Sequence, residues 1–153
     1  MKLALIQQHA TKDKSANVAR GLAKLEAAAR AGAELACYAE LAFEWFHPQR
    51  PATGAVTHLA ESLDGPLVQA CQHKARELGI VVVLNLFERD HDKTYDSSPV
   101  IDADGSFLGV TRMVHITEYA CFHEQGYYTP GDRGAPVYRT PVGNVGVAIC
   151  YVR

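Results

Sequence analysis

Residues 95–114, YDSSPVIDADGSFLGVTRMV, decide the fold of this chain. Strand-like runs at 95–101 and 107–114 flank the dipeptide Asp104-Gly105. An Asp-Gly pair between two such runs is a strong short-range signal for a β-hairpin. We therefore predict two antiparallel strands here.

Upstream of the hairpin, the sequence alternates between strand-like and helix-like segments. We expect one helix to be capped by Ser15 and to end near Gly32, and another to run from Pro66 to about Leu78. Three short apolar runs have the length of buried strands, at residues 3–7, 35–38 and 80–84. Two β-α units followed by a hairpin predict an α/β fold with a mixed sheet.

Two further segments complete the predicted organisation. Residues 44–64 contain aromatic residues and two prolines without a clear period, which is typical of a long loop. Near the end of the chain, residues 137–140 and 145–150 flank a Pro-Val-Gly-Asn turn and predict a second hairpin.

Composition and charge exclude several classes of partner. The chain is 48% hydrophobic and 21% charged, as in a globular domain, and its formal net charge is −2. Because it has no Lys/Arg cluster, we do not expect nucleic acid to bind. The first apolar run is too short for a signal peptide or a membrane span, so we expect a cytoplasmic protein with no membrane partner.

Metal and nucleotide motifs do not occur. The four cysteines form no CxxC pair, and the seven histidines form no HExxH motif. There is no GxGxxG or P-loop sequence either, and GNVG is better explained as a hairpin turn. We therefore expect no metal and no cofactor, and rank metal-dependent hydrolysis and nucleotide binding last.

Glu40 and Cys150 are the candidate reactive residues. Glu40, in YAELAF, follows the predicted strand 35–38, and α/β sheets place their chemistry at such strand ends. Cys150 closes the apolar run VGVAIC, where a strand that turns sharply lifts a thiol into a pocket. Each residue also has a structural interpretation, as a solvated surface carboxylate and as a buried, inert cysteine. Taken alone, the residues leave both interpretations open.

Several segments in order resemble the nitrilase superfamily of carbon–nitrogen hydrolases over essentially the whole chain: AELAF, YDSSPVIDADGSFLG, HEQGYYTPGD and GNVGVAICY. The pattern is closest to amidases of the N-carbamoylputrescine or carbamoyl-amino-acid type. The resemblance implies the N-terminal part of an αββα sandwich, with a mixed sheet and helices on one face. Residues 1–153 would then be a partial domain that stops just after the nucleophile strand.

The resemblance also implies a mechanism. A glutamate, lysine and cysteine triad hydrolyses an amide, carbamoyl or nitrile carbon–nitrogen bond through a thioester, without metal or cofactor. Glu40 matches the general base, Cys150 the nucleophile, and Glu124 the family's second glutamate, so we expect the three to converge. For a small-molecule substrate, the candidate contacts are Trp45, Phe46, His115 and Tyr151. We also expect a homo-oligomer.

Met113 departs from the family pattern. The family's lysine lies in Arg-Lys-x-His-Ile, and here the matching residues read RMVHI, with Met113 at the lysine position. A thioether cannot donate a hydrogen bond to an oxyanion, and losing one such donor costs about 3 kcal/mol of barrier, roughly a hundredfold in rate. Arg112 should point to the opposite face of its strand, whereas His115 should share the face of Met113.

Three explanations of this departure stay open. The alignment shifts within TRMVHITEY, the subgroup uses another donor such as His115, or the chemistry is lost. The last explanation gives our second hypothesis, a non-catalytic α/β binding or assembly module that keeps the hydrolase fold. Two other positions also depart from the family, Ala39 in place of a proline and Val152 in place of an aspartate.

Overall fold

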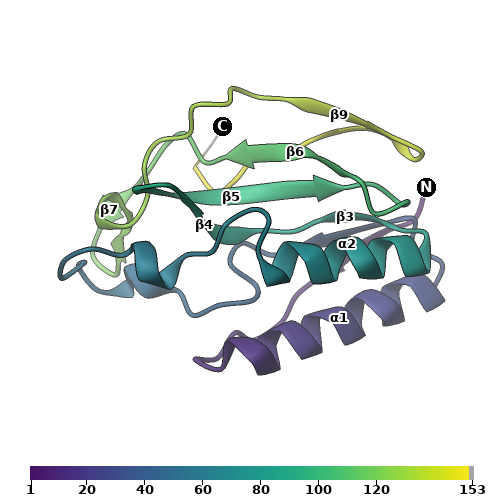
Figure 1. Ribbon diagram of the computed structural model, residues 1–153, viewed down its shortest axis with the longest axis horizontal. Helices are drawn as coiled ribbons and strands as arrows, with labels where there is room; N and C mark the ends of the chain where they lie inside the picture. Colours follow the sequence, from purple (N-terminus) through teal and green to yellow (C-terminus); the bar gives the residue numbers. More distant parts are fainter. Residues whose placement is uncertain (152–153) are drawn as a thin grey trace.

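The computed structural model describes residues 1–151, and it contains two long helices against one face of a six-stranded sheet (Figure 1). The helices are α1 (Lys14–Arg30) and α2 (Pro66–Leu78). The strands of the sheet are β1 (Leu3–Ile6), β2 (Leu35–Tyr38), β3 (Val81–Val83), β4 (Leu86–Asp90), β5 (Lys93–Ile101) and β6 (Phe107–Arg112). The predicted α/β class, with helices on one face, is confirmed.

The sheet is mixed, as the sequence predicts. β1, β2 and β3 are parallel, and β3 then pairs antiparallel with β5. β5 pairs with β6 along one edge and with both β3 and β4 along the other. β3 and β4 therefore lie end to end, and the break between them falls at Leu84 and Asn85.

The predicted hairpin turn holds the sheet against α2. Gly105 has φ of 85°, and a Cβ there would meet the Gln72 carbonyl oxygen at 2.6 Å, so this position requires glycine. Arg76 Nε donates to the Asp104 carbonyl oxygen at 2.8 Å, and Gln72 Nε2 donates to the Gly105 carbonyl oxygen at 3.0 Å. The turn is thus fixed by backbone contacts as well as by its own conformation.

The two faces of the sheet have different partners. Ala36, Val82 and Ile101 belong to the core cluster that α1 and α2 cover. Their strand neighbours point the other way, and there Val81 and Val100 pack with Tyr138 of β9 (Val137–Thr140). β9 and β10 (Gly143–Gly146) form a separate two-stranded sheet. This alternation is the period of two expected for strands buried on both faces.

Some sequence expectations about individual elements were wrong. Asp13, not Ser15, caps α1, because its Oδ1 accepts from the Ala16 N–H at 3.0 Å. β4 was missed. The strand expected at residues 145–150 ends at Gly146, so Cys150 lies in a turn rather than at a strand end.

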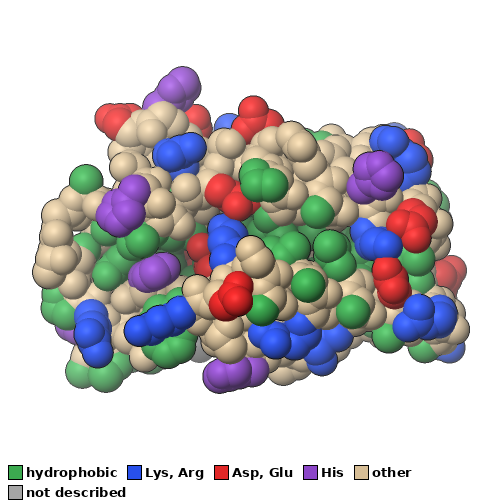
Figure 2. All heavy atoms as spheres, turned by 60° about the horizontal axis from the view of Figure 1, so that its bottom comes forward, with side chains coloured by type: hydrophobic (Ala, Val, Ile, Leu, Met, Phe, Trp, Pro, Cys, Tyr) green, Lys and Arg blue, Asp and Glu red, His purple; other side chains and the backbone are tan. Residues whose placement is uncertain are grey.

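The long loop after Glu44 contains two short 3₁₀ helices, η1 (His47–Gln49) and η2 (Thr57–Leu59). Val152 lies outside the described residues. On the face shown in Figure 2, Lys and Arg side chains are interspersed with Asp and Glu. Within residues 1–151, no helix is long and apolar enough to cross a membrane.

A buried ion pair fixes β6 against β4. Arg112 and Glu88 are 2% and 1% exposed, and the Arg112 guanidinium donates to both carboxylate oxygens of Glu88. It also bonds Asp90 at 2.7 Å and Asp132 at 2.9 Å, and it stacks 3.8 Å from the centroid of the Tyr95 ring. Arg112 therefore has a structural role, in ion pairs on the face opposite to its neighbour Met113, as strand alternation predicts.

Removing the cation should destabilise the chain strongly. Arg112→Met leaves Glu88 as an uncompensated buried charge, and we expect the free energy of unfolding in urea to fall by about 3–5 kcal/mol. Adding Glu88→Gln removes that charge, so the double variant should recover about 1 kcal/mol or more. If the double variant is the less stable of the two, the buried charge is not the cause of the loss.

Candidate active site

Glu40, Glu124 and Cys150 come together from three separate parts of the chain. One oxygen of each carboxylate and the Cys150 sulfur all lie within 4.8 Å of one another. Glu40 follows β2 at the carboxyl end of the parallel strands, where α/β sheets form their sites. The structure therefore supplies a thiol with two carboxylates beside it.

The backbone is strained at both reactive segments. Leu41, directly after Glu40, has φ of 47°, and Cys150 itself has φ of 51°. Non-glycine residues rarely adopt this left-handed conformation, and it persists only where the surrounding structure holds it. At Leu41 the holding contact is visible, because its N–H donates to Asn85 Oδ1 at 2.6 Å. Sharp turns of this kind present a side chain toward a site.

Glu124 is fully buried and presents one carboxylate oxygen without a partner. It lies in η3 (Glu124–Gly126), which follows the small hairpin of β7 (Glu118–Tyr119) and β8 (Phe122–His123). Its Oε2 accepts from the Thr117 N–H at 3.2 Å and from the Thr117 hydroxyl at 2.7 Å. Oε1 is buried and bonds none of the described residues. Burial raises the pKa of Glu124, while the Thr117 hydrogen bonds oppose that rise.

The Cys150 thiol is protonated at neutral pH. Partial burial of the side chain raises its pKa to about 11. The negative charges of Glu40 and then Glu124 add to this rise. The Tyr151 backbone N–H opposes the shift. A thiol in this state is a weak nucleophile, so any reaction through Cys150 needs a base to take its proton.

Met113 belongs to a buried apolar cluster that includes a sequence neighbour of Glu40 and one of Cys150. It is fully buried and packs in one cluster with Leu41, which follows Glu40, and Ile149, which precedes Cys150. Among residues 1–151, no Lys, Arg or His side chain forms an ion pair with Glu40 or Glu124. The position that the family resemblance assigns to lysine therefore shares an apolar cluster with the sequence neighbours of Glu40 and Cys150, and its side chain carries no charge.

His115 does not share the environment of Met113. β6 ends at Arg112, so strand alternation does not continue to residue 115, and His115 is exposed. The expectation that the two side chains share a face was wrong. Within residues 1–151, His115 is not part of the group formed by Glu40, Glu124 and Cys150.

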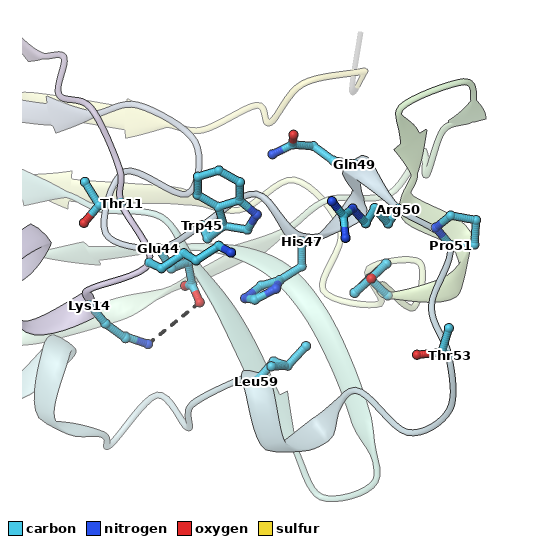
Figure 3. Close-up of a pocket in the computed structure, with 12 residues that line it drawn as sticks. Thr11, Lys14, Glu44, Trp45, His47, Gln49, Arg50, Pro51, Thr53 and Leu59 are labelled. Carbon is cyan, nitrogen blue, oxygen red and sulfur yellow. Dashed lines mark ion pairs between the residues drawn. The ribbon is translucent and has the colours of Figure 1, made fainter.

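The aromatic residues proposed as substrate contacts lie in different places. Trp45 lines a cavity of about 880 Å³ together with Lys14, Glu44 and His47, all visible in Figure 3. Phe46 instead packs against Phe122, with ring centroids 5.3 Å apart. Tyr151 is exposed, and its hydroxyl lies 3.5 Å from that of Tyr119.

The cavity and the three converging side chains are distinct parts of the structure. None of the three is among the residues that line it. Tyr127 lines the cavity and also packs in the same cluster as Met113. Tyr127 thus connects the lining of the cavity with the apolar cluster of Met113, and the cavity is a candidate location for the distal part of a substrate.

Two polar residues beneath the site were missed by the sequence analysis. Asp96 is fully buried in β5, and Asn85 is 3% exposed at the break between β3 and β4. Asn85 Nδ2 donates to Asp96 Oδ1 at 2.6 Å and to Ser98 Oγ at 3.1 Å. The local sequence carries little signal for either residue, because Asn85 lies between two strands and Asp96 lies next to Ser97 and Ser98 in β5.

The donor set alone assigns no metal. The three converging atoms are close enough together to share an ion, but acidic groups often lie at such spacing without one. A protonated thiol beside two carboxylates matches the needs of acid–base chemistry, in which one carboxylate accepts the thiol proton.

Comparison with known proteins gives a consistent result. A family model described as carbon–nitrogen hydrolase matches residues 2–153. An N-carbamoylputrescine amidase of Solanum lycopersicum is 35% identical over 97% of this chain and 50% of its own length. A citrullinase of Francisella tularensis is 32% identical over 99% of this chain and 53% of its own length.

Solved structures agree on the fold. The crystal structure of a carbon–nitrogen hydrolase from Helicobacter pylori superposes with a TM-score of 0.88 at 24% identity, covering 97% of this chain and 51% of that one. The chain thus spans about half the length of the curated relatives that it matches.

The absence of a cation at position 113 gives a direct test. Met113→Lys places a positive charge beside Glu40, Glu124 and Cys150, so the thiol pKa should fall from about 11. The alkylation rate of Cys150 with iodoacetamide at pH 8, followed by mass spectrometry, should rise about tenfold or more. Met113→Leu keeps the volume without the charge and should change the rate by less than about twofold. An unchanged rate in Met113→Lys would place residue 113 away from the thiol.

Proposed function

This chain belongs to the carbon–nitrogen hydrolase family, and on that premise we propose that it contributes the reactive half of an amide-directed hydrolase. The bond that is cleaved is a non-peptide carbon–nitrogen bond, and Cys150 is the nucleophile. The observation that carries the proposal is the approach of Glu40 and Glu124 to the Cys150 sulfur within 4.8 Å.

Glu40 acts as the general base. It takes the proton of the Cys150 thiol, and the resulting thiolate attacks the carbonyl carbon of the amide. When the tetrahedral intermediate collapses, its C–N bond breaks, and Glu40 returns the proton to the departing ammonia or amine. A water molecule that Glu40 then deprotonates attacks the thioester, which releases the carboxylic acid and restores the thiol.

The electrostatics of the site support this division of roles. Because the thiol pKa is about 11, few Cys150 side chains are thiolate at neutral pH, and proton transfer to a nearby carboxylate is required. Glu40 is exposed and can be reached by water for the second step. The unpartnered Oε1 of Glu124 is available to accept an N–H of the substrate amide.

The relatives narrow the class of substrate. The two curated relatives described above are named for carbamoyl chemistry, N-carbamoylputrescine in one and citrulline in the other. We therefore propose a small carbamoyl compound or simple amide as the substrate, with a nitrile as the less favoured possibility. Trp45 would contact its distal part, because this residue lines the cavity of about 880 Å³.

Two features should limit the rate. Met113 offers no hydrogen bond to the developing oxyanion, which costs about 3 kcal/mol when a donor is lost. The curated relatives also carry about as much chain again beyond the matched half. In the whole protein, we propose that this other half supplies pocket walls and substrate contacts.

Two proposals accompany this function. We infer a homo-oligomer, supported by an exposed aromatic cluster next to the site, made of Tyr119, Phe122 and Tyr151. We also infer a cytoplasmic location, which rests on the sequence alone.

Ammonia release tests the proposal. We would assay a carbamoyl compound and a simple amide with four chains: residues 1–153 and a version extended by a second half like that of the relatives, each with Met113 and with Met113→Lys. Both short chains should stay near background. The extended Met113→Lys chain should turn over readily, because groups that act as one catalytic unit are strongly non-additive.

Cys150→Ala in the extended Met113→Lys chain is the control, and it should abolish ammonia release. If the extended chain with Met113 intact already works at an ordinary enzyme rate, residue 113 is not the missing oxyanion donor. If none of the extended chains releases ammonia, the hydrolase proposal fails.

A further inference from the structure

We propose that Asp96 is a positioning residue for Glu40: it holds a proton and donates a hydrogen bond from its Oδ2 to the Glu40 carboxylate. The inference rests on the proposed role of Glu40 as the base. It concerns a residue that lies beneath the site and that does not itself touch the substrate.

Asp96 and Glu40 face each other as two carboxyl groups. The Asn85 side chain links the two residues, because its Oδ1 accepts from the N–H of Leu41, next to Glu40, and its Nδ2 donates to Asp96 Oδ1. Two ionised carboxylates have only acceptors, and Asp96 Oδ2 accordingly accepts no hydrogen bond from any residue in the described part of the chain. A hydrogen bond between them requires one proton, held by one of the two groups.

The surroundings place that proton on Asp96. Asp96 is fully buried, whereas Glu40 is exposed to water, and a buried charge without a partner is costly. Burial raises the pKa of Asp96, and the nearby negative charge of Glu40 raises it further. Within residues 1–151, Glu124, Tyr128 and Cys150 also interact electrostatically with Asp96, and none of these three groups is a cation.

Asn85 determines which oxygen of Asp96 carries the proton. The Leu41 N–H donates to Asn85 Oδ1, so the other end of this amide must be the NH₂ group. That NH₂ group donates to Asp96 Oδ1 at 2.6 Å. Oδ1 is therefore an acceptor, and the proton resides on Oδ2, the oxygen without any other partner.

This arrangement holds Glu40 at both ends. Asn85 fixes the strained backbone after Glu40 through Leu41, and Asp96 fixes the carboxylate. A carboxylate has two oxygens, so one can accept from Asp96 while the other faces the Cys150 thiol. The hydrogen bond orients and stabilises the anionic base, and it does so without a positive charge. Asp96 thereby supplies part of what a cation at position 113 would supply.

Infrared spectroscopy of the folded 153-residue chain tests the protonation directly. A protonated carboxylic acid absorbs in a band that carboxylates lack, and the spectrum of Asp96→Asn should be missing one such band at pH 7. In Glu40→Gln the Asp96 band should remain but shift in frequency, because a neutral amide replaces the charged acceptor. Glu40 is exposed, so this second variant keeps the fold even if Asp96→Asn does not.

Alkylation of Cys150 provides an independent readout. Asn replaces a neutral acid with another neutral donor, so Asp96→Asn should change the rate at pH 8 by less than about twofold. An ionised Asp96 predicts instead a rate increase of about tenfold, because a negative charge near the thiol is lost. That increase, or an acid band that Glu40→Gln leaves unmoved, would overturn the proposal. Neither readout depends on turnover, so a failure of hydrolysis is distinguishable from a failure of this inference.

Discussion

The hydrogen bond from the Leu41 backbone to the Asn85 side chain is the contact on which the site depends. Asn85 occupies the break between β3 and β4, where one edge of β5 changes partner. From there its amide holds the left-handed turn after Glu40 and orients Asp96 beneath it. Asn85 lies between the two strands, and its side chain bonds Leu41 and Asp96. The break between β3 and β4 thus provides the residue that supports Glu40.

The groups around Glu40 are acidic. Three carboxyl groups and a thiol lie together, and within residues 1–151 no cation is paired with Glu40 or Glu124. Burial and then the negative charge of Glu40 raise the pKa of the Cys150 thiol to about 11, and the same two causes raise the pKa of Asp96. The buried cation Arg112 neutralises Glu88 on the face of the sheet opposite to Met113. Because Met113 is uncharged, position 113 supplies no positive charge to the site.

Much of the fold could be predicted from the sequence, because local signals agree with the tertiary structure. β2 coincides with the apolar run at residues 35–38, and α2 runs from Pro66 to Leu78 as expected. β4 escaped prediction because its buried Glu88 is neutralised by a residue far away in the sequence, and a charged run reads as solvent-exposed.

The site was only partly predictable for a related reason. Family motifs pointed to Glu40, Glu124 and Cys150, which the structure brings together, but their catalytic roles remain proposals. VGVAIC has the apolar pattern of a strand, yet the backbone leaves β10 at Gly146 and turns sharply at Cys150. Asp96 and Asn85 depend on long-range hydrogen bonds that no local pattern encodes.

The central claim, that Glu40 and Cys150 share one site, is tested most directly by the pH dependence of Cys150 alkylation in Glu40→Gln. Glu40 raises the thiol pKa, so removing its charge should lower that pKa from about 11 and accelerate alkylation at pH 8. Glu77→Gln, which removes an exposed carboxylate on α2, serves as the matched control and should have no effect. An identical alkylation profile in Glu40→Gln and the unaltered chain would contradict the account.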